Sequence, residues 1–182
     1  LFPHLGDSLI NTLKKFGYEV IIPKGVVCCG TPLRALGLED EAVELAKKNL
    51  GIFGRLKVDA ILSPCPTCTH TLKDDYLKII GDGLEKAVDI SVFFNDKLTM
   101  TEPINKTSVY HDPCHLYYSL GVKKEPREII KKAGVDLVDL EEAGCCGFGG
   151  LFCLSSREIS NNLLSERTKK IMDSKADTVI TS

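Results

Sequence analysis

The sequence predicts an α/β protein made of two tandem, homologous Rossmann-like βαβ units with parallel sheets. One observation is an internal repeat, in which Cys28-Cys29-Gly30 returns as Cys145-Cys146-Gly147 at an offset of 117 residues (145 − 28). The other is an alternation of short β-branched runs with longer amphipathic segments, which is typical of parallel strands joined by crossover helices. We therefore expect a first cysteine-bearing repeat over residues 1–100 and a second over 101–182.

The repeat extends beyond the cysteines. The segment Gly17-Tyr18-Glu19-Val20 corresponds to Gly134-Val135-Asp136-Leu137 at the same offset. Asp59–Ser63 corresponds to Asp177–Thr181 at an offset of 118, as expected after one inserted residue. The duplication therefore includes predicted strands as well as candidate site residues.

The first unit is predicted to alternate helices and strands. Its first helix has Asp7 or Ser8 as the N-cap and Gly17 as the stop, with apolar residues at helical spacing between them. The elements that follow are a strand over Tyr18–Ile22, a helix over Glu39–Phe53 and a buried parallel strand over Val58–Leu62.

The second unit is predicted to repeat this order. Its elements are a strand over Thr107–His111, a helix with Pro126 in its first turn, a strand over Val135–Val138, a helix capped by Ser155 or Ser156 that carries Ile159, Leu163 and Ile171, and a strand over Ala176–Thr181. The segment 81–106 shows little periodicity and is predicted to be a connection.

Composition excludes several classes of function. The 182 residues carry a net charge of −2, with 43% apolar and 26% charged residues, and the charges alternate in sign along the chain. Such a chain has neither the basic patch of a nucleic-acid-binding protein nor an apolar run of the ~20 residues that a membrane-spanning helix needs. With no secretory signal visible, we expect a cytoplasmic protein, held at a membrane only through partner subunits. Because it starts at Leu1 and stops after an apolar run, we expect a piece of a longer protein.

Eight cysteines stand out against this ordinary background: Cys28, Cys29, Cys65, Cys68, Cys114, Cys145, Cys146 and Cys153. A chain with a normal core and no secretory signal does not need disulfides, and a reducing compartment disfavours them. Metal or redox chemistry is therefore the preferred interpretation.

Several cysteines fall where α/β sheets bind their ligands. Cys65 and Cys68 follow one predicted strand and open the next helix, and Cys114 follows another strand. In open parallel sheets, ligands bind at the carboxyl ends of the strands. The free N–H groups and the dipole of a helix N-terminus also favour the thiolate form that a metal requires.

The spacing of the cysteines favours a cluster over a single ion. A C-x-x-C motif such as Cys65–Cys68 is shared by zinc sites, iron–sulfur sites and thioredoxin-like dithiols. The adjacent pair Cys28-Cys29 is more informative, because neighbouring side chains diverge and fit several irons better than one tetrahedral zinc. Gly30 would allow close approach of the backbone, and Pro32 would start a helix.

The repeat also predicts cysteines outside the printed sequence. Cys114 precedes Cys145 by 31 positions (145 − 114), so the first unit should have a cysteine at the fourth position before Leu1. Cys65 and Cys68 shifted by 118 fall on the first and fourth positions after Ser182. Each complete site would then contain one cysteine, a Cys-Cys pair and a C-x-x-C.

Four segments together resemble the cysteine-rich "CCG" domain family, which includes the B-type component of heterodisulfide reductase and the iron–sulfur subunits of glycolate, lactate and glycerol-3-phosphate oxidising systems. The segments are Cys28-Cys29-Gly30-Thr31-Pro32, Ser63-Pro64-Cys65-Pro66-Thr67-Cys68, Tyr110-His111-Asp112-Pro113-Cys114-His115-Leu116 and Cys145-Cys146-Gly147-Phe148-Gly149-Gly150.

The resemblance implies that [4Fe-4S] clusters of the noncubane type are held at the two sites. The implied ligands are Cys28, Cys29, Cys65 and Cys68 at the first site and Cys114, Cys145 and Cys146 at the second. In heterodisulfide reductase such clusters split a disulfide in one-electron steps. By resemblance, the pairs Cys28-Cys29 and Cys145-Cys146 are the candidate catalytic residues, and the C-x-x-C in the first copy favours the heterodisulfide-reductase-like branch.

Three other functions stay open at this point. The chain could be the electron-transfer subunit of a glycolate- or lactate-type dehydrogenase, a structural zinc-binding assembly module, or a thioredoxin-like dithiol at Cys65 and Cys68. Zinc could also fill one of the two sites. For the redox functions the expected partners are other redox subunits or a ferredoxin-type domain, with a thiol/disulfide or 2-hydroxy-acid-linked electron source.

Three residues near the motifs are given structural roles. Cys153 has Leu36 at its repeat-equivalent position and is predicted to be a buried structural thiol. His111 and His115 flank Cys114, where they could hydrogen-bond sulfur or relay protons, but we expect them to orient the loop.

Overall fold

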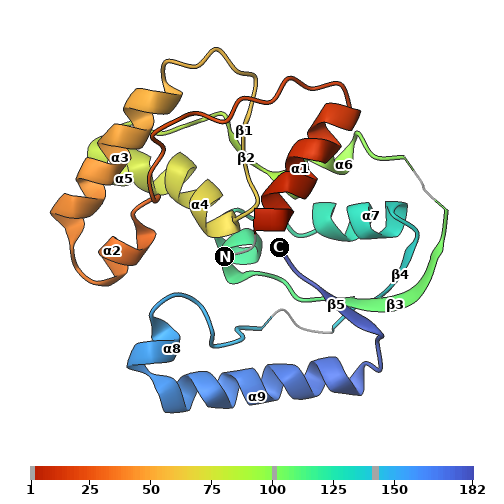
Figure 1. The fold of residues 1–182 in the computed structure, drawn as a ribbon. Helices are drawn as coiled ribbons and strands as arrows, with labels where there is room; N and C mark the ends of the chain where they lie inside the picture. The colour runs from red at the N-terminus through yellow and green to blue at the C-terminus, as the bar shows by residue number, and fades with distance from the viewer. Residues whose placement is uncertain (1–2, 100–101, 141–143) are drawn as a thin grey trace.

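The computed structural model describes residues 3–99, 102–140 and 144–182. It is a mixed α/β structure in which every strand pairing is parallel (Figure 1), and this confirms the predicted fold class. None of the described helices has the length and apolar character needed to cross a membrane.

The longest helices are α1, α3 and α9, and the longest strand is β3. The described helices are α1 (Pro3–Lys15), α2 (Thr31–Ala35), α3 (Glu39–Phe53), α4 (Pro66–His70), α5 (Tyr76–Ile80), α6 (Ile90–Asn95), α7 (Glu125–Lys132), α8 (Phe152–Ser155) and α9 (Arg157–Asp173), with π-helical turns η1 (Thr71–Asp75) and η2 (His115–Ser119). The strands are β1 (Ile61–Ser63), β2 (Ala87–Asp89), β3 (Ile104–Tyr110), β4 (Val135–Val138) and β5 (Thr178–Ile180).

The strands form two small parallel sheets. In one, β1 pairs with β2, with Leu62 opposite Val88. In the other, β3 lies between β4 and β5, with Val109 opposite both Val138 and Val179. The predicted helix over Glu39–Phe53 and the predicted strand over Val135–Val138 are confirmed to the residue, and the predicted strands at 58–62, 107–111 and 176–181 are confirmed with shifted ends.

A compact core fixes the first sheet to its helices. Ala46 of α3 is fully buried against Leu72 of η1 and Tyr76 of α5, and Ala87 of β2 closes the same cluster. Burying a large side chain contributes about 1.5–3 kcal/mol, so this cluster holds the segments on both sides of the C-x-x-C in place.

The prediction of a strand over Tyr18–Ile22 is wrong, because the structure has no strand in these residues. The repeat-equivalent strand β4 is hydrogen-bonded to β3. In the described part of the chain no strand lies beside 18–22 in the corresponding place. Tyr18 instead packs against Phe93 with 5.2 Å between ring centroids, and Ile22 is 70% exposed.

The prediction that 81–106 is only a connection is also wrong, since β2, α6 and the start of β3 lie in it. Asp89 caps α6 by accepting a hydrogen bond from the Ser91 backbone N–H at 2.8 Å. A three-residue strand followed by a six-residue helix is too short to show periodicity in sequence.

Two details of the predicted helices need correction as well. α1 begins at Pro3, so Asp7 and Ser8 lie inside the helix and do not cap it, although its end before Gly17, at φ 80°, is confirmed. In α9, Ser156 is the N-cap residue without a side-chain hydrogen bond, and Ile159 of the predicted apolar face is 59% exposed. The buried positions of α9 are instead the polar residues Ser160 and Arg167.

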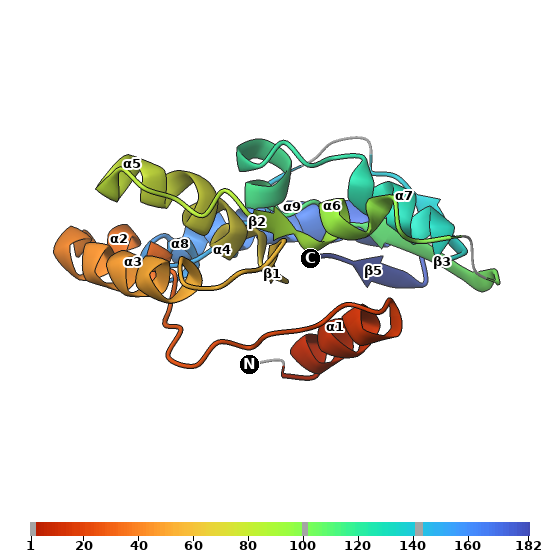
Figure 2. The same ribbon diagram turned by 90° about the horizontal axis from the view of Figure 1, so that it is seen from above.

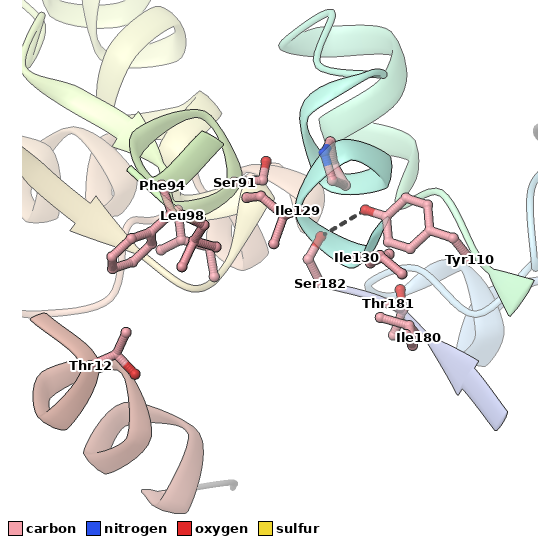
Figure 3. A pocket seen from close by; sticks show the side chains of 12 residues that line it. Thr12, Ser91, Phe94, Leu98, Tyr110, Ile129, Ile130, Ile180, Thr181 and Ser182 are labelled. Atoms are coloured by element: carbon pink, nitrogen blue, oxygen red, sulfur yellow. Dashed lines mark hydrogen bonds between the residues drawn. The ribbon is translucent and has the colours of Figure 1, made fainter. Parts of the chain in front are cut away.

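Helix α1 covers an apolar cavity away from the cysteines. Seen from above (Figure 2), α1 lies to one side of the layer that contains β1 and β5. Between α1, α6, α7 and β5 is a cavity of about 240 Å³, lined by side chains such as Phe94, Leu98 and Ile130 (Figure 3). At its edge Tyr110 and Ser182 are joined by a hydroxyl–hydroxyl hydrogen bond of 3.4 Å. None of the eight cysteines lines this cavity, so it is separate from the candidate site.

An ion pair between the partly buried Arg127 and the buried Asp112 braces the turn that leaves β3. Two nitrogens of Arg127 in α7 donate to the two carboxylate oxygens of Asp112, each at 2.8 Å. Arg127 also donates to the exposed Asp139 at 2.8 Å and lies over the Tyr110 ring. Asp112 is only 5% exposed and precedes Cys114 by two residues, so this pair fixes where Cys114 leaves the sheet.

We expect replacement of Asp112 by Ala to lower the free energy of unfolding by about 3 kcal/mol, because it leaves the Arg127 guanidinium without its buried partner. The matched change Asp139→Ala removes only an exposed contact of the same guanidinium and should cost less than about 1 kcal/mol. Urea denaturation measures both values. Equal losses would show that the Asp112 pair does not brace the turn.

Candidate metal centre

The structure brings three cysteines of the first unit to one point. Cys29 lies in the loop before α2, Cys65 is the N-cap residue of α4, and Cys68 is within α4. The Sγ atoms of Cys29 and Cys68 are 3.6 Å apart, and Cys68 also hydrogen-bonds Cys65. α4 follows β1 directly, so the group sits at the carboxyl end of that strand, as predicted.

The two members of the first cysteine pair differ in exposure. Cys29 is buried at 8% exposure, whereas Cys28 is exposed. Cys28 directly precedes Cys29 in the chain, and its charge, like those of Cys29 and Cys68, acts in the same direction as burial, which raises the pKa of Tyr76. The adjacent thiols therefore differ in their access to solvent.

Asn49 holds the cysteine-pair loop on the core. This α3 side chain is 1% exposed and makes four hydrogen bonds. Its amide oxygen accepts from the Val27 N–H at 3.0 Å, and its amide nitrogen donates to the carbonyls of Val27 and Cys28 at 3.2 Å and to the Tyr76 hydroxyl at 3.0 Å. Both ends of the amide are thus engaged, which fixes the loop rigidly on the core.

Two turns next to the cysteines follow from local sequence. Gly30 has φ 95°, a left-handed conformation that favours glycine, and a Cβ there would lie 3.4 Å from Ala42. Pro32 lies in the first turn of α2, also as predicted. After β1, the Ser63 hydroxyl accepts from the Cys65 N–H at 3.1 Å and directs the chain into α4.

The three inner thiols share protons. A hydrogen bond from the Cys68 thiol lowers the pKa of Cys29 to about 5, against the opposing effect of burial. The same donor, helped by the N–H groups of Cys68 and Thr67, lowers the pKa of Cys65 to about 6. The pKa of Cys68 is raised, and its single thiol hydrogen can be donated to only one of the two sulfurs at a time. Hydrogen bonding therefore favours the thiolate form at Cys29 and Cys65 over that at Cys68, and thiolate is the form that binds a metal.

The second unit assembles a similar group less tightly. Burial raises the pKa of Cys114, and the next causes are the charge and a hydrogen bond of Cys145 and the charge of Cys146. Cys145 is exposed and accepts a hydrogen bond from the Gly147 N–H at 3.3 Å. The structure therefore brings Cys145 to Cys114, and Cys146 follows Cys145 in the chain.

The segments that follow the two groups of cysteines pack on each other, α4 against η2. The hydroxyl of Thr67, between Cys65 and Cys68, is 2.7 Å from Nδ1 of His115, the residue after Cys114. The rings of His70 and His115 stack with 6.2 Å between centroids. Residues adjacent to candidate ligands of both groups are thus in direct contact.

Two residues that flank the cysteine motifs, His111 and Cys153, were given structural roles from sequence. His111 accepts a hydrogen bond at Nδ1 from Nε of the buried Arg167 at 3.0 Å, and burial and that cation lower its pKa. Cys153 is only half-buried, with its Sγ 3.5 Å from the Gly150 carbonyl, so the prediction that it is buried is wrong.

In the described ranges, no three His, Cys, Asp or Glu side chains have the geometry to hold a single metal ion.

Sequence reasoning missed three residues that shape the site: Asn49, Thr31 and Thr71. Thr31 follows the Cys-Cys-Gly motif, and its hydroxyl is 3.4 Å from the Cys29 sulfur and 2.6 Å from the Thr71 hydroxyl. A polar residue amid the apolar face of the predicted Glu39–Phe53 helix was the available signal for Asn49. Thr31 and Thr71 had none, because 40 residues separate them in the chain.

Replacing Asn49 by Leu should lower the free energy of unfolding by about 3 kcal/mol, because three loop groups and the Tyr76 hydroxyl lose their buried partner. It should also speed alkylation of Cys29, which the loop keeps buried. Urea denaturation and timed alkylation with mass spectrometry measure these effects. Lys48→Leu, at an exposed neighbouring position of α3, is the control and should change neither. Unchanged alkylation of Cys29 in the Asn49 variant would contradict the role given to this residue.

In the second unit, Gly147→Ala should be far more damaging than Gly150→Ala. Both glycines have positive φ, at 72° and 58°, which costs an alanine about 1–2 kcal/mol. Only at Gly147 would the added Cβ also meet backbone, 2.5 Å from the Ser160 carbonyl oxygen, whereas Gly150 has nothing within 4 Å. Thermal denaturation should show a clearly larger drop in Tm for Gly147→Ala, and similar drops would refute the close packing.

Comparison with known proteins agrees with this geometry. The chain is 36% identical over 182 residues to an uncharacterized iron-sulfur protein of Methanocaldococcus jannaschii and 36% identical over 184 residues to one subunit of the fumarate reductase (CoM/CoB) of Methanothermobacter marburgensis. Each match covers 98% of this chain but only 36% and 37% of the relative. Lactate utilization protein A 2 of Bacillus cereus is 29% identical over 194 residues, which cover 98% of this chain and 79% of the relative.

The family comparison covers both cysteine groups. The CCG cysteine-rich domain matches at residues 2–73, which include the first group, and at 108–182, which include the second. These two segments make up most of the chain and contain all eight cysteines. The chain therefore belongs to the CCG cysteine-rich domain family.

Proposed function

We propose that this chain is the iron–sulfur part of an oxidoreductase and holds a [4Fe-4S] cluster at each of its two cysteine groups. The observation that carries the proposal is the convergence of Cys29, Cys65 and Cys68, with the sulfurs of Cys29 and Cys68 3.6 Å apart and Cys28 next to Cys29 in the chain. The repeats 1–100 and 101–182 would each supply one such site. The names of relatives, an iron-sulfur protein and a component of a fumarate reductase, support this choice.

The donor set suits iron–sulfur chemistry. Fe–S clusters are held by cysteine thiolates, and Cys29 and Cys65 already have lowered pKa values. Cys28 is exposed and Cys29 is buried, so the adjacent side chains diverge, which suits a cluster of several irons better than one tetrahedral zinc ion. The ligands would be Cys28, Cys29, Cys65 and Cys68 in the first group and Cys114, Cys145 and Cys146 in the second.

The residues of the chain have separable tasks in this function. A bound cluster would supply one-electron chemistry and, at an open iron, a place for a substrate sulfur. Asn49 keeps Cys28 and Cys29 in position, and the ion pair of Arg127 with Asp112 does the same for Cys114. The exposed thiols Cys28 and Cys145 are where a partner or substrate can approach each group, so their pairs are the candidate catalytic residues.

The reaction proposed is electron transfer, with reduction of a disulfide as its most specific form. A relative named for CoM and CoB supports a thiol/disulfide substrate, as in heterodisulfide reductases. A relative named for lactate utilization supports an electron source linked to 2-hydroxy acids instead. In either case the partners would be other redox subunits or a ferredoxin-type domain.

The test is metal analysis of the full-length protein purified without oxygen. We expect iron with an equal amount of acid-labile sulfide, and an EPR signal that changes on reduction. Cys29→Ser should remove roughly half of the iron, because it disables one of two groups. Cys153→Ser is the matched control and should retain all of it, since this thiol lies outside both groups.

Two results would contradict the proposal. Zinc without sulfide would identify a structural assembly module. Disulfide reduction that survives removal of all metal, and that is indifferent to Cys28→Ser and Cys29→Ser, would identify a dithiol at Cys65 and Cys68.

A further inference from the structure

Two sulfurs of the first group are close enough to react with each other. The Sγ atoms of Cys29 and Cys68 are 3.6 Å apart, although the two cysteines are 39 positions apart in the chain, and both thiols are free. In a disulfide the sulfurs are about 2.05 Å apart, so these two would have to approach by about 1.5 Å. Small rotations of the two side chains can supply that movement. The pair is therefore placed for a disulfide as well as for a metal.

Hydrogen bonds of the protein keep the two segments that carry these sulfurs together. Thr31 follows Cys29 by two residues, and its hydroxyl is 2.6 Å from that of Thr71. Thr71 follows Cys68 by three residues, and its hydroxyl donates to the Thr67 carbonyl at 2.8 Å. The hydrogen between the two hydroxyls therefore comes from Thr31. The contact between the sulfurs is thus supported beside it by a bond between side chains and does not depend on a metal.

The two thiols differ in their access to solvent. Cys29 is buried at 8% exposure, whereas Cys68 is partly exposed. Thiol–disulfide exchange begins with attack on a disulfide by a thiol that the reagent can reach. A small reagent therefore meets Cys68 first, and Cys29 is the second thiol, which attacks from inside the protein.

We propose that Cys29 and Cys68 form a reversible disulfide when the first site carries no cluster, with a low-molecular-weight disulfide as the oxidant. Cys68 attacks one sulfur of the small disulfide, which releases one small thiol and leaves a mixed disulfide at Cys68. Cys29 then attacks the Cys68 sulfur and releases the second small thiol. The two protein thiols lose two electrons and two protons, and the small disulfide becomes two thiols.

The disulfide and a cluster at the first site exclude each other. A metal binds the thiolate, and neither sulfur of a disulfide is a thiolate. Cys29 and Cys68 are two of the four ligands proposed for this site, so oxidation closes it until a thiol reduces the bond. Transient disulfides of this kind serve redox sensing in reducing compartments. This consequence rests on the proposed function, whereas the disulfide itself rests on the contact between the two sulfurs.

The test is oxidation of the full-length protein with oxidised glutathione in the absence of oxygen, before and after a chelator removes its iron. Free thiols are then alkylated, and trypsin releases Cys29 in the peptide 25–34 and Cys68 in the peptide 58–73. We expect mass spectrometry to show a cross-link between these peptides in the iron-free protein. The cross-link should be lost on treatment with a thiol reductant, and it should be absent from the iron-loaded protein.

Four variants identify the sulfurs, because each peptide contains two cysteines. Cys29→Ser and Cys68→Ser should abolish the cross-link. The matched changes Cys28→Ser and Cys65→Ser, each at the other cysteine of the same peptide, should retain it. Circular dichroism checks that all four variants are folded, and the fragment masses of the cross-linked peptides assign the sulfurs in the unaltered protein as well.

The outcomes separate this inference from the proposed function. The inference is overturned if the iron-free protein forms no cross-link, if the cross-link persists in Cys29→Ser or Cys68→Ser, or if the only disulfide joins Cys65 to Cys68 within one peptide. A cross-link in the iron-loaded protein overturns the exclusion between disulfide and cluster. A protein that binds no iron overturns the proposed function and that exclusion with it, while the cross-link still decides whether the disulfide forms.

Discussion

Crowding of thiol groups is the constraint on which the rest of this structure depends. Cys29, Cys65 and Cys68 meet in a half-buried place where neighbouring thiolates repel and desolvation opposes their charge. The structure offsets this cost with hydrogen-bond donors: the Cys68 thiol, the N–H groups that open α4, and the Thr31 backbone N–H. The Asn49 side-chain amide hydrogen-bonds the backbone of Val27 and Cys28 and the hydroxyl of Tyr76 in the core. These bonds hold the Cys28-Cys29 loop in place against the repulsion between neighbouring thiolates.

Much of this arrangement could be predicted from sequence, because the cysteine motifs, the helix starts and the carboxyl ends of the strands depend on residues close together in the chain. Cys65 and Cys68 open α4 directly after β1, and Pro32 and Pro126 lie in first turns, as their neighbours indicated. The grouping of the cysteines also followed, since the carboxyl ends of parallel strands share one edge of a sheet. Residue type and spacing carried these predictions without any knowledge of distant contacts.

The errors come from features that depend on a distant partner or on very short elements. Tyr18–Ile22 has the composition of a strand, but a strand exists only when another is hydrogen-bonded to it. β2 and α6 are stabilised by the partner β1 and by the Asp89 cap rather than by a periodic pattern. The hydroxyls of Thr31 and Thr71 are in contact although 40 residues separate them in the chain, and neither residue has a sequence feature that predicts this contact.

The duplication preserves positions more faithfully than chemistry. Ala42 of α3 and Ser160 of α9 are related by 118 residues (160 − 42), and each packs its motif glycine from the same place. In the first copy the contact is a methyl group, whereas in the second the Ser160 hydroxyl donates to the Gly147 carbonyl at 2.6 Å.

Asn49 and Arg167, buried polar residues on the same two helices, are related by the same offset (167 − 49). Asn49 holds the cysteine-pair loop itself, but Arg167 donates to His111, beside the other ligand segment of its copy. Two copies built on one frame therefore keep the same cysteine pair while surrounding it with different side chains.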